Sequence, residues 1–232
     1  FGNVHAAFAD NGTVAFVSGN DLAIGRLGWV DRQGNGDVFD MQERTYGVFD
    51  VFPNNDQRFA IQVADVKDYV LIWDVNSGGQ DLSEKGNLIY PVWSPDGTQL
   101  ATASRPPGSD KIKVLLYDVD TWMPQEVAQS DSLISLDSWS KPDSISFTRA
   151  GDVFQVGILN PTYSTKESPW LLPTDNNPEF MYALSALSPN ADWIAYSTNK
   201  GTGQYQVWIQ QVNGGGRRQI SRGSGLEPVW CR

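Results

Sequence analysis

Short runs of apolar residues alternate with turn-forming residues along the whole chain, and their order repeats. Each repeat contains two apolar stretches of four to six residues, rich in β-branched and aromatic side chains. The first stretch of each repeat lies at 13–17, 58–63, 99–103, 144–148 and 193–197. The second stretch lies at 27–31, 71–75, 115–119, 153–158 and 206–210. Runs of this length and composition, separated by Gly, Asn, Asp and Ser, predict β-strands.

An aromatic or large apolar residue, here called the anchor, precedes the turn that leads into each first stretch. The anchors are 41 to 48 residues apart and are Phe8, Phe52, Trp93, Trp139, Leu187 and Trp230. Each of the first five is followed by a sequence rich in Pro, Asn, Asp or Gly, most clearly Ser-Pro-Asp-Gly at 94–97, as tight turns require. A weaker fourth strand should close each unit, as at 218–221. Four short strands in about 40 to 45 residues is the size of a propeller blade.

The pattern predicts an all-β fold, a β-propeller of four-stranded blades with five complete blades and the first strand of a sixth. The 232 residues form a single domain, with the incomplete blade at 223–232 and the complete blades at 1–44, 45–86, 87–131, 132–179 and 180–222. Three strands of the sixth blade are then missing. Flanking sequence of a longer protein, closure by five blades, or a capping partner would each account for this, and we favour the first. An uncovered sheet edge also permits oligomers through the incomplete blade.

The composition fits one folded domain and excludes several classes of function. Apolar residues make up 40% of the chain, and no run of about 18 of them could span a membrane. The net charge of −10 should repel nucleic acid and anionic membranes, so neither is an expected partner. The chain begins at Phe1 without a signal run, which indicates a processed or excised piece of a longer protein. The single cysteine is compatible with the cytosol and the periplasm, and we favour an extracytoplasmic location.

Catalytic chemistry has few candidate residues. His5 is the only histidine, and neither a Gly-x-Ser-x-Gly elbow nor a phosphate-binding glycine loop occurs. One histidine and one cysteine, Cys231, cannot form a tetrahedral zinc site without carboxylates. The pair Asp118 and Asp120 lacks the further oxygen ligands and the glycine of a calcium loop. We therefore expect no enzyme activity, no cofactor and no metal.

Three acidic residues on the innermost strands are candidates for ligand binding. Asp50 and Asp137 stand two residues before their anchors, which predicts equivalent positions in two blades near the central channel. Converging carboxylates there could bind a cation, an amine or a basic peptide. The alternative is that each aspartate accepts hydrogen bonds from neighbouring backbone, because buried charges need partners. Glu227 lies at the open junction, where it would be exposed or contact missing sequence.

Two of the nine tryptophans do not fit the repeat. The other seven fall on repeat strands and are expected to form core between blades. Trp122 and Trp170 lie in the outer parts of their blades beside prolines, so either could face solvent and anchor a protein partner. Packing against the outer strand is the alternative for both.

The repeat also carries a family resemblance. The segment Trp-Ser-Pro-Asp-Gly-Thr-Gln-Leu-Ala-Thr at 93–102, followed by Leu-Leu-Tyr-Asp-Val at 115–119, resembles the repeat of TolB-type, WD-like β-propellers. The segments 187–230 and 28–34 are similar to blades of propellers attached to bacterial Ser/Thr kinases and transcriptional regulators. Such propellers usually have six blades, and the resemblance covers essentially the whole chain.

The resemblance implies a non-catalytic scaffold for protein–protein interaction or ligand sensing within a larger bacterial-type protein. A second hypothesis is an accessory propeller of a serine peptidase of the prolyl oligopeptidase or dipeptidyl peptidase IV type, with its catalytic domain outside this chain. A third is a hydrolase or lyase with its site in the channel. Sequence flanking the chain would separate the first two hypotheses. A kinase, a DNA-binding domain or a transmembrane helix would favour the scaffold, and an α/β-hydrolase would favour the peptidase.

Overall fold

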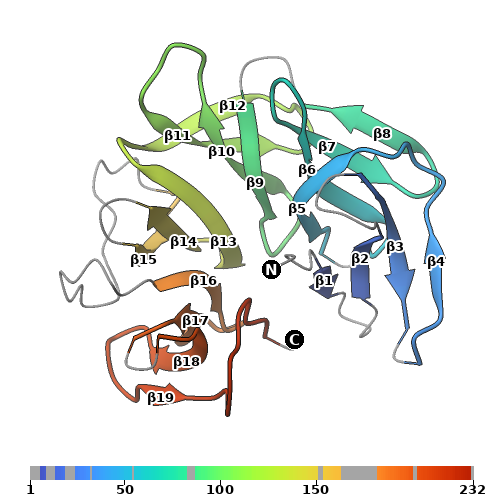
Figure 1. The fold of residues 1–232 in the computed structure, drawn as a ribbon. Coiled ribbons are helices and arrows are strands. Elements are labelled where there is room, and N and C mark those ends of the chain that lie inside the picture. Colours follow the sequence, from blue (N-terminus) through green and yellow to red (C-terminus); the bar gives the residue numbers. More distant parts are fainter. Residues whose placement is uncertain are drawn as a thin grey trace.

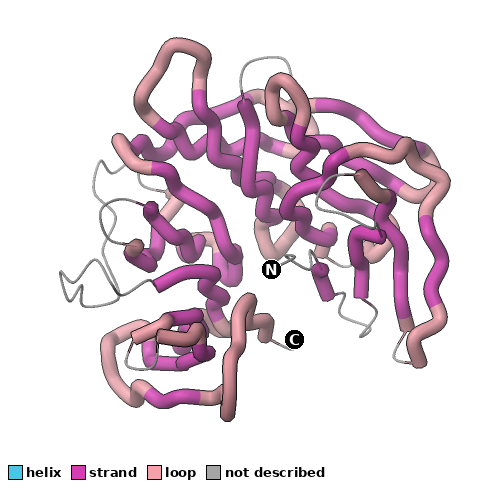
Figure 2. Tube along the Cα trace, viewed as in Figure 1, coloured by secondary structure: helices cyan, strands magenta, loops and turns pink. Residues whose placement is uncertain are grey.

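The described part of the chain is built from β-strands alone. The computed structural model describes residues 6–8, 14–18, 24–31, 33–53, 55–82, 87–150, 154–162, 182–200 and 203–230. Five antiparallel sheets of three or four strands surround a common centre (Figure 1), and the remaining described residues form loops and turns (Figure 2). No helix forms in these ranges, and hence none that could cross a membrane. The predicted all-β propeller of five blades is confirmed.

Each of the first three blades contains four strands. Blade 1 consists of β1 (Ala6–Phe8), β2 (Val14–Ser18), β3 (Arg26–Val30) and β4 (Gly36–Val38). Blade 2 consists of β5 (Thr45–Val51), β6 (Arg58–Ala64), β7 (Tyr69–Asp74) and β8 (Gly78–Asp81). Blade 3 consists of β9 (Asn87–Trp93), β10 (Gln99–Arg105), β11 (Ile112–Asp118) and β12 (Pro124–Ser130).

The last two blades differ in the number of strands described. Blade 4 consists of β13 (Leu133–Lys141), β14 (Ser144–Ala150) and β15 (Gln155–Leu159). Its predicted fourth strand falls largely on residues outside the described ranges. Blade 5 consists of β16 (Tyr182–Leu187), β17 (Trp193–Thr198), β18 (Gln206–Gln211) and β19 (Arg218–Gln219). Within every sheet the strands pair in chain order, so each blade is an antiparallel meander.

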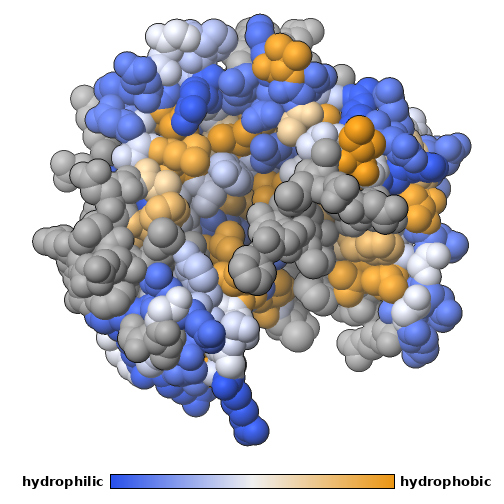
Figure 3. Space-filling model, in the orientation of Figure 1, coloured by the Kyte–Doolittle hydropathy of each residue, from blue (hydrophilic) through white to orange (hydrophobic). Residues whose placement is uncertain are grey.

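Four apolar clusters hold neighbouring blades together. Each cluster combines buried side chains from two successive blades, such as Ala15 and Leu27 of blade 1 with Phe59 and Ile61 of blade 2. The other three span the junctions of blades 2 and 3, 3 and 4, and 4 and 5. Full burial of a large apolar side chain such as Leu27 or Ile61 contributes about 1.5–3 kcal/mol. On the face drawn in Figure 3 the periphery is mostly hydrophilic, and hydrophobic side chains are visible mainly inside it.

Among the described residues, the ring is not closed between blade 5 and blade 1. The innermost strands contact one another in sequence, β1 with β5, β5 with β9, β9 with β13 and β13 with β16. No contact of similar extent joins β16 to β1 among the described residues. In Figure 1 the C-terminal segment runs back from β19 toward the centre between these two blades. Closure by five blades, one of the three alternatives above, is therefore not what the described residues form.

The predicted first strand of a sixth blade is not confirmed, because residues 223–230 form no β-strand. None of the described strands pairs with these residues, so the backbone N–H and C=O groups of a strand there would have no partners in a sheet. Part of the inner-strand geometry is nevertheless present. Glu227 has φ of 54°, as has Tyr90, and Leu184 has 53°; each stands three residues before an anchor. The indole Nε1 of Trp230 donates to the carbonyl of Ala186 on β16 at 2.8 Å.

Candidate functional site

The Ser-Pro-Asp-Gly motif builds a turn. Ser94 Oγ donates to Asp96 Oδ1 at 2.7 Å and accepts from the Gln99 N–H at 2.9 Å. The Asp96 carboxylate also accepts from the Thr98 N–H at 3.0 Å. These bonds, that of Ser94 above all, lower the pKa of Asp96. Gly97 has φ of 73°, and a Cβ there would lie 2.6 Å from the Phe52 ring, so glycine is required at this position. The motif is therefore structural.

Strand pairing corrects the alignment of blade 2 by one residue. Val51 pairs with Phe59 as Trp93 pairs with Leu100 and Trp139 pairs with Ile145. The structural anchor of blade 2 is thus Val51 and not Phe52. The turn after Val51 is one residue longer than the turn after Trp93. The sequence alone therefore offered two adjacent apolar residues, Val51 and Phe52, as candidates for the anchor.

This shift overturns the predicted equivalence of Asp50 and Asp137. Asp50 pairs with Ala60, so its counterpart in blade 4 is Ser138, which pairs with Ser146. Asp137 lies in the β-bulge between Leu136 and Ser138. The two carboxylates therefore occupy different repeat positions, and they serve different blade junctions.

Asp50 and Ser138 form equivalent bonds between blades. Asp50 Oδ2 accepts from the backbone N–H of Trp93 at 2.8 Å, and Ser138 Oγ accepts from the backbone N–H of Leu187 at 2.9 Å. In each case an inner-strand oxygen satisfies the anchor of the next blade. Hydrogen bonding to neighbouring backbone, the structural alternative for Asp50, is thus observed. Ligand binding by Asp50 stays a prediction.

Asp137 is the centre of a hydroxyl-rich network. Ser135 Oγ donates to its Oδ1 at 2.8 Å, and Thr148 Oγ1 donates to its Oδ2 at 2.6 Å. From blade 5, Ser185 donates to Oδ2 both its N–H, at 3.0 Å, and its hydroxyl, at 2.6 Å. Burial raises the pKa of Asp137, and the four hydrogen bonds oppose that shift. Both carboxylate oxygens are already engaged, which fits a structural link between blades 4 and 5; a ligand-binding role for Asp137 stays a prediction.

Trp122 packs against its neighbours in an aromatic cluster around an arginine. The guanidinium carbon of Arg58 lies 5.0 Å from the ring centre of Phe52, 5.6 Å from that of Trp93 and 5.9 Å from that of Trp122. Edge-on contacts join Phe52 to Trp93 at 5.0 Å and Trp93 to Trp122 at 6.4 Å. Trp122, in the turn between β11 and β12, has φ of 53° and is half-buried. Its predicted role as a partner anchor is untested, and Trp170 lies outside the described residues.

Glu227 lies in an exposed segment at the open junction. Leu226 and Val229 on either side of it are 51% and 56% exposed, and Ile220 and Leu184 are 50% and 37% exposed. Half of the large hydrophobic side chains exposed in the described ranges thus belong to blade 5 and the segment after it. Binding through Glu227 stays a prediction; its neighbours Leu226 and Val229 are exposed and apolar.

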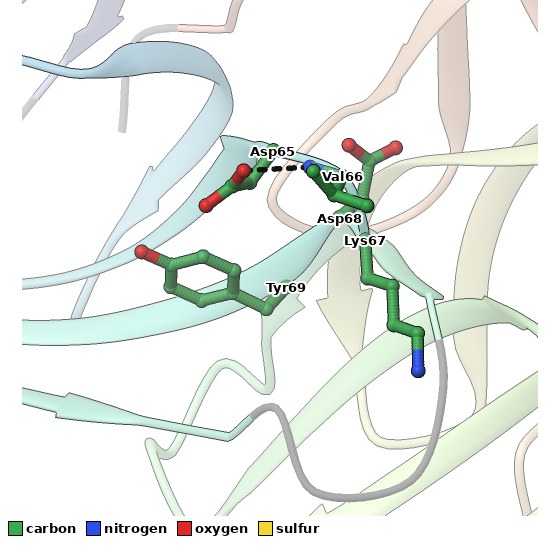
Figure 4. A pocket seen from close by; sticks show the side chains of 5 residues that line it. All are labelled: Asp65, Val66, Lys67, Asp68 and Tyr69. Atoms are coloured by element: carbon green, nitrogen blue, oxygen red, sulfur yellow. Dashed lines mark hydrogen bonds between the residues drawn. The ribbon is translucent and has the colours of Figure 1, made fainter.

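A depression lies at the β6–β7 turn. Its volume is about 450 Å³, and consecutive residues of this turn line it: Asp65, Val66, Lys67, Asp68 and Tyr69 (Figure 4). Val66 is 97% exposed, so the depression is open to solvent. Its lining comes from a single turn, and it lacks the polar groups converging from several elements that characterise a binding pocket. Among the described residues no three of the potential ligands His, Cys, Asp and Glu gather around a common point.

Two groups of residues were not predicted from the sequence. Arg58 was missed because its repeat position, occupied by Gln99 in blade 3 and Trp193 in blade 5, has no recurring residue type. Ser135, Thr148 and Ser185 are short polar residues on strands and resemble ordinary core hydroxyls in sequence. A signal existed only for Ser185, which stands at the same distance from its anchor as Asp137.

Comparison with known proteins identifies the fold. No family model and no curated protein matches the chain. The structure of a putative TolB from Agrobacterium tumefaciens superposes with a TM-score of 0.75 at 12% identity, over 93% of this chain and 79% of that one. TolB from Acinetobacter baumannii superposes with a TM-score of 0.69 at 16% identity, over 90% of this chain and 52% of that one. This chain therefore spans about half the length of that relative.

Peptidases also contain the same fold. A prolyl endopeptidase structure superposes with a TM-score of 0.59 at 15% identity, over 90% of this chain and 35% of that one. Identities in this range show shared architecture and carry no information on activity. The chain has the fold of the TolB-like β-propellers.

Proposed function

We propose that this chain is a non-catalytic β-propeller scaffold that binds a protein partner or an attached domain within a larger bacterial-type protein. The observation that carries the proposal is the apolar surface of the open junction. On its blade 5 side, Leu184, Ile220, Leu226 and Val229 are between 37% and 56% exposed. Exposed apolar surface of this kind marks interaction sites in soluble proteins.

Among the described residues, blade 1 presents apolar side chains on the face that points away from blade 2. Ala15 is buried in the cluster with blade 2, so Val14 and Phe16 point to the opposite face by the alternation of a strand. Val30 pairs with Val14, and Val38 pairs with Gly28, which itself pairs with Phe16, so both valines lie on the same face as Val14 and Phe16. Val38 is 48% exposed, and Val14, Phe16 and Val30 are half-buried. In blade 3, by contrast, Leu100, Ala101, Thr102 and Ala103 are all 0% exposed, because both faces are covered.

The molecular mass in solution tests the proposal. Without its partner the isolated chain should self-associate through the open junction, with a mass that rises with concentration in sedimentation equilibrium. The double variant Leu226→Lys, Val229→Lys should be monomeric, because charge in this surface opposes its burial. Met123→Lys is the control, since Met123 is 68% exposed on blade 3 and should leave association unchanged. A wild-type chain that stays monomeric at every concentration, like the double variant, would remove the support for partner binding here.

A second candidate function is that of the accessory propeller of a serine peptidase. The prolyl endopeptidase match favours it, because this chain matches only 35% of that peptidase chain, so the larger part of that protein lies outside the matched region. An α/β-hydrolase domain in the same polypeptide would support this function. A kinase, DNA-binding or membrane-spanning segment in its place would contradict it.

A further inference from the structure

The arginine in the aromatic cluster has unused hydrogen-bonding capacity. Arg58 is half-buried, and its guanidinium carries five N–H donors in a planar fork. The ion pairs of the described residues join Arg26 to Glu43, Lys111 to Asp131 and Lys113 to Glu126, and none involves Arg58. Its side chain also makes no hydrogen bond with the described residues. The nearby rings supply an attractive π-face but no acceptor for the N–H groups.

The carboxylates of the surrounding turns are engaged in those turns. Asp74, the strand partner of Arg58, accepts from the N–H groups of Asn76 and Ser77 at 2.9 and 3.1 Å. Asp118, at the turn that carries Trp122, accepts from the Thr121 N–H and hydroxyl, each at 3.0 Å. Each of these two acids stabilises its own turn, and no ion pair joins Arg58 to a carboxylate of the described residues.

A second donor in the same cluster also lacks an acceptor. Trp93 is 3% exposed, and its indole Nε1 has no hydrogen-bond partner. A buried N–H without an acceptor costs about 1–3 kcal/mol. The rings of Phe52, Trp93 and Trp122 attract the guanidinium through cation–π contacts, which reduces the side-chain entropy that is lost when a ligand binds to it.

We propose that Arg58, held by Phe52, Trp93 and Trp122, is a recognition site for a carboxylate supplied by a ligand outside this chain. A carboxylate accepts two parallel N–H bonds from the arginine fork, and its flat shape fits beside aromatic rings. The net charge of −10 disfavours a phosphate dianion relative to a monoanion. The carboxylate comes from a peptide C-terminus or from an Asp or Glu side chain. The site lies between blades 2 and 3 and is independent of the open junction.

The test follows the Arg58 Nε–Hε resonance of the ¹⁵N-labelled chain by NMR. N-acetylglycine probes a terminal carboxylate, N-acetylglutamic acid α-amide a side-chain carboxylate, and N-acetylglycinamide the uncharged control; inorganic phosphate is the fourth arm. We expect saturable shifts with one or both carboxylates, and a larger response from one would identify the source. N-acetylglycinamide should give none, and phosphate should bind more weakly.

Variants connect binding to the guanidinium. Because hydrogen bonds to charged groups contribute about 1.5–3 kcal/mol, Arg58→Gln should weaken carboxylate binding about tenfold or more. In this variant the chemical shift of the Trp122 indole N–H reports the binding. Arg58→Lys keeps the charge but loses the fork and should also weaken binding. Arg222→Gln, at an exposed position, is the control. If Arg58→Gln does not fold, Trp122→Leu retains the arginine, and its affinity for N-acetylglycine should fall. Equal shifts from acid and amide, no shift in the wild type, or unchanged affinity in a folded Arg58→Gln variant would each overturn the proposal.

Discussion

The junction of blades 2 and 3 and the junction of blades 4 and 5 join the same repeat by different chemistry. At the first, Trp93, Leu100 and Tyr117 belong to an apolar cluster, and the bonds from Trp93 and Tyr90 N–H groups to Asp50 and Gln62 supplement it. At the second, the buried apolar cluster is smaller, and Asp137 and neighbouring hydroxyls form a network with blade 5. A repeat thus fixes where blades meet and leaves open which interaction joins them.

Truncation of the apolar junction should have the largest effect. Trp93→Ala removes a side chain that is 3% exposed and leaves a cavity, which should lower the free energy of unfolding by about 3–5 kcal/mol. Urea denaturation measures the loss. Met123→Ala, at a position 68% exposed, should lie within about 0.5 kcal/mol of the wild type. A Trp93→Ala loss as small as the control's would mean that this junction is not held by apolar burial.

Removal of the Asp137 carboxylate should have the next largest effect. Asp137→Ala leaves the Ser185 N–H and the Thr148 hydroxyl without their acceptor, and the free energy of unfolding should fall by about 2–3 kcal/mol. Ser135→Ala, which removes a single bond to the same carboxylate, should cost about 1 kcal/mol. Equal losses in the two variants would show that the network is not centred on Asp137.

The Asp137 network should also make stability depend on pH with a definite sign. Burial raises the pKa of Asp137 above the ordinary 3.8, so the folded chain holds this proton more tightly than the unfolded chain. Wild-type stability relative to Asp137→Asn should therefore decrease as pH rises from about 3.8 through the folded pKa, and then level off. Urea denaturation of both variants across this range measures the difference, and a difference that rises with pH would contradict the raised pKa.

The two equivalent bonds to the next anchor should make similar contributions. Asp50→Ala and Ser138→Ala each remove the acceptor of that anchor's N–H, and Ser138→Ala also removes the bond between the Ser138 and Ser146 hydroxyls. Each variant should lower the free energy of unfolding by about 1 kcal/mol. Thermal and urea denaturation of the two variants give the comparison. A loss in Asp50→Ala as large as that in Asp137→Ala would contradict similar contributions of the Asp50 and Ser138 bonds.

The turn carboxylate Asp96 should have the smallest effect, with the opposite pH dependence. Hydrogen bonds lower its pKa, so its stabilisation is present above the unfolded pKa of about 3.8 and is lost as pH falls through the folded value. Asp96→Asn should cost less than about 1 kcal/mol at neutral pH and nothing in acid, because the group is largely exposed. If the free energy of unfolding changed with pH in the same way in Asp96→Asn and in the wild type, this assignment would be contradicted.

Local patterns predicted the strands and the number of blades, because strand composition and turn chemistry are properties of neighbouring residues. The choice between Val51 and Phe52 as anchor was beyond such patterns, since only pairing with β6 selects one of two adjacent apolar residues. The position of Arg58 over Trp93 and Trp122 depends on how two blades pack, which no local pattern encodes. The last predicted strand is not confirmed, and its conformation depends on a neighbouring strand as well as on its own residues.

The left-handed residues Tyr90, Leu184 and Glu227 also mark a natural cut point for recombination. A chain that bends at the same place, with nearly the same φ, enters each of these inner segments in one orientation. Joints placed just before these residues should therefore match when blades are exchanged or duplicated. The costly part of the joint, a left-handed conformation at a residue other than glycine, is then inherited intact with the transplanted blade and does not have to be designed anew.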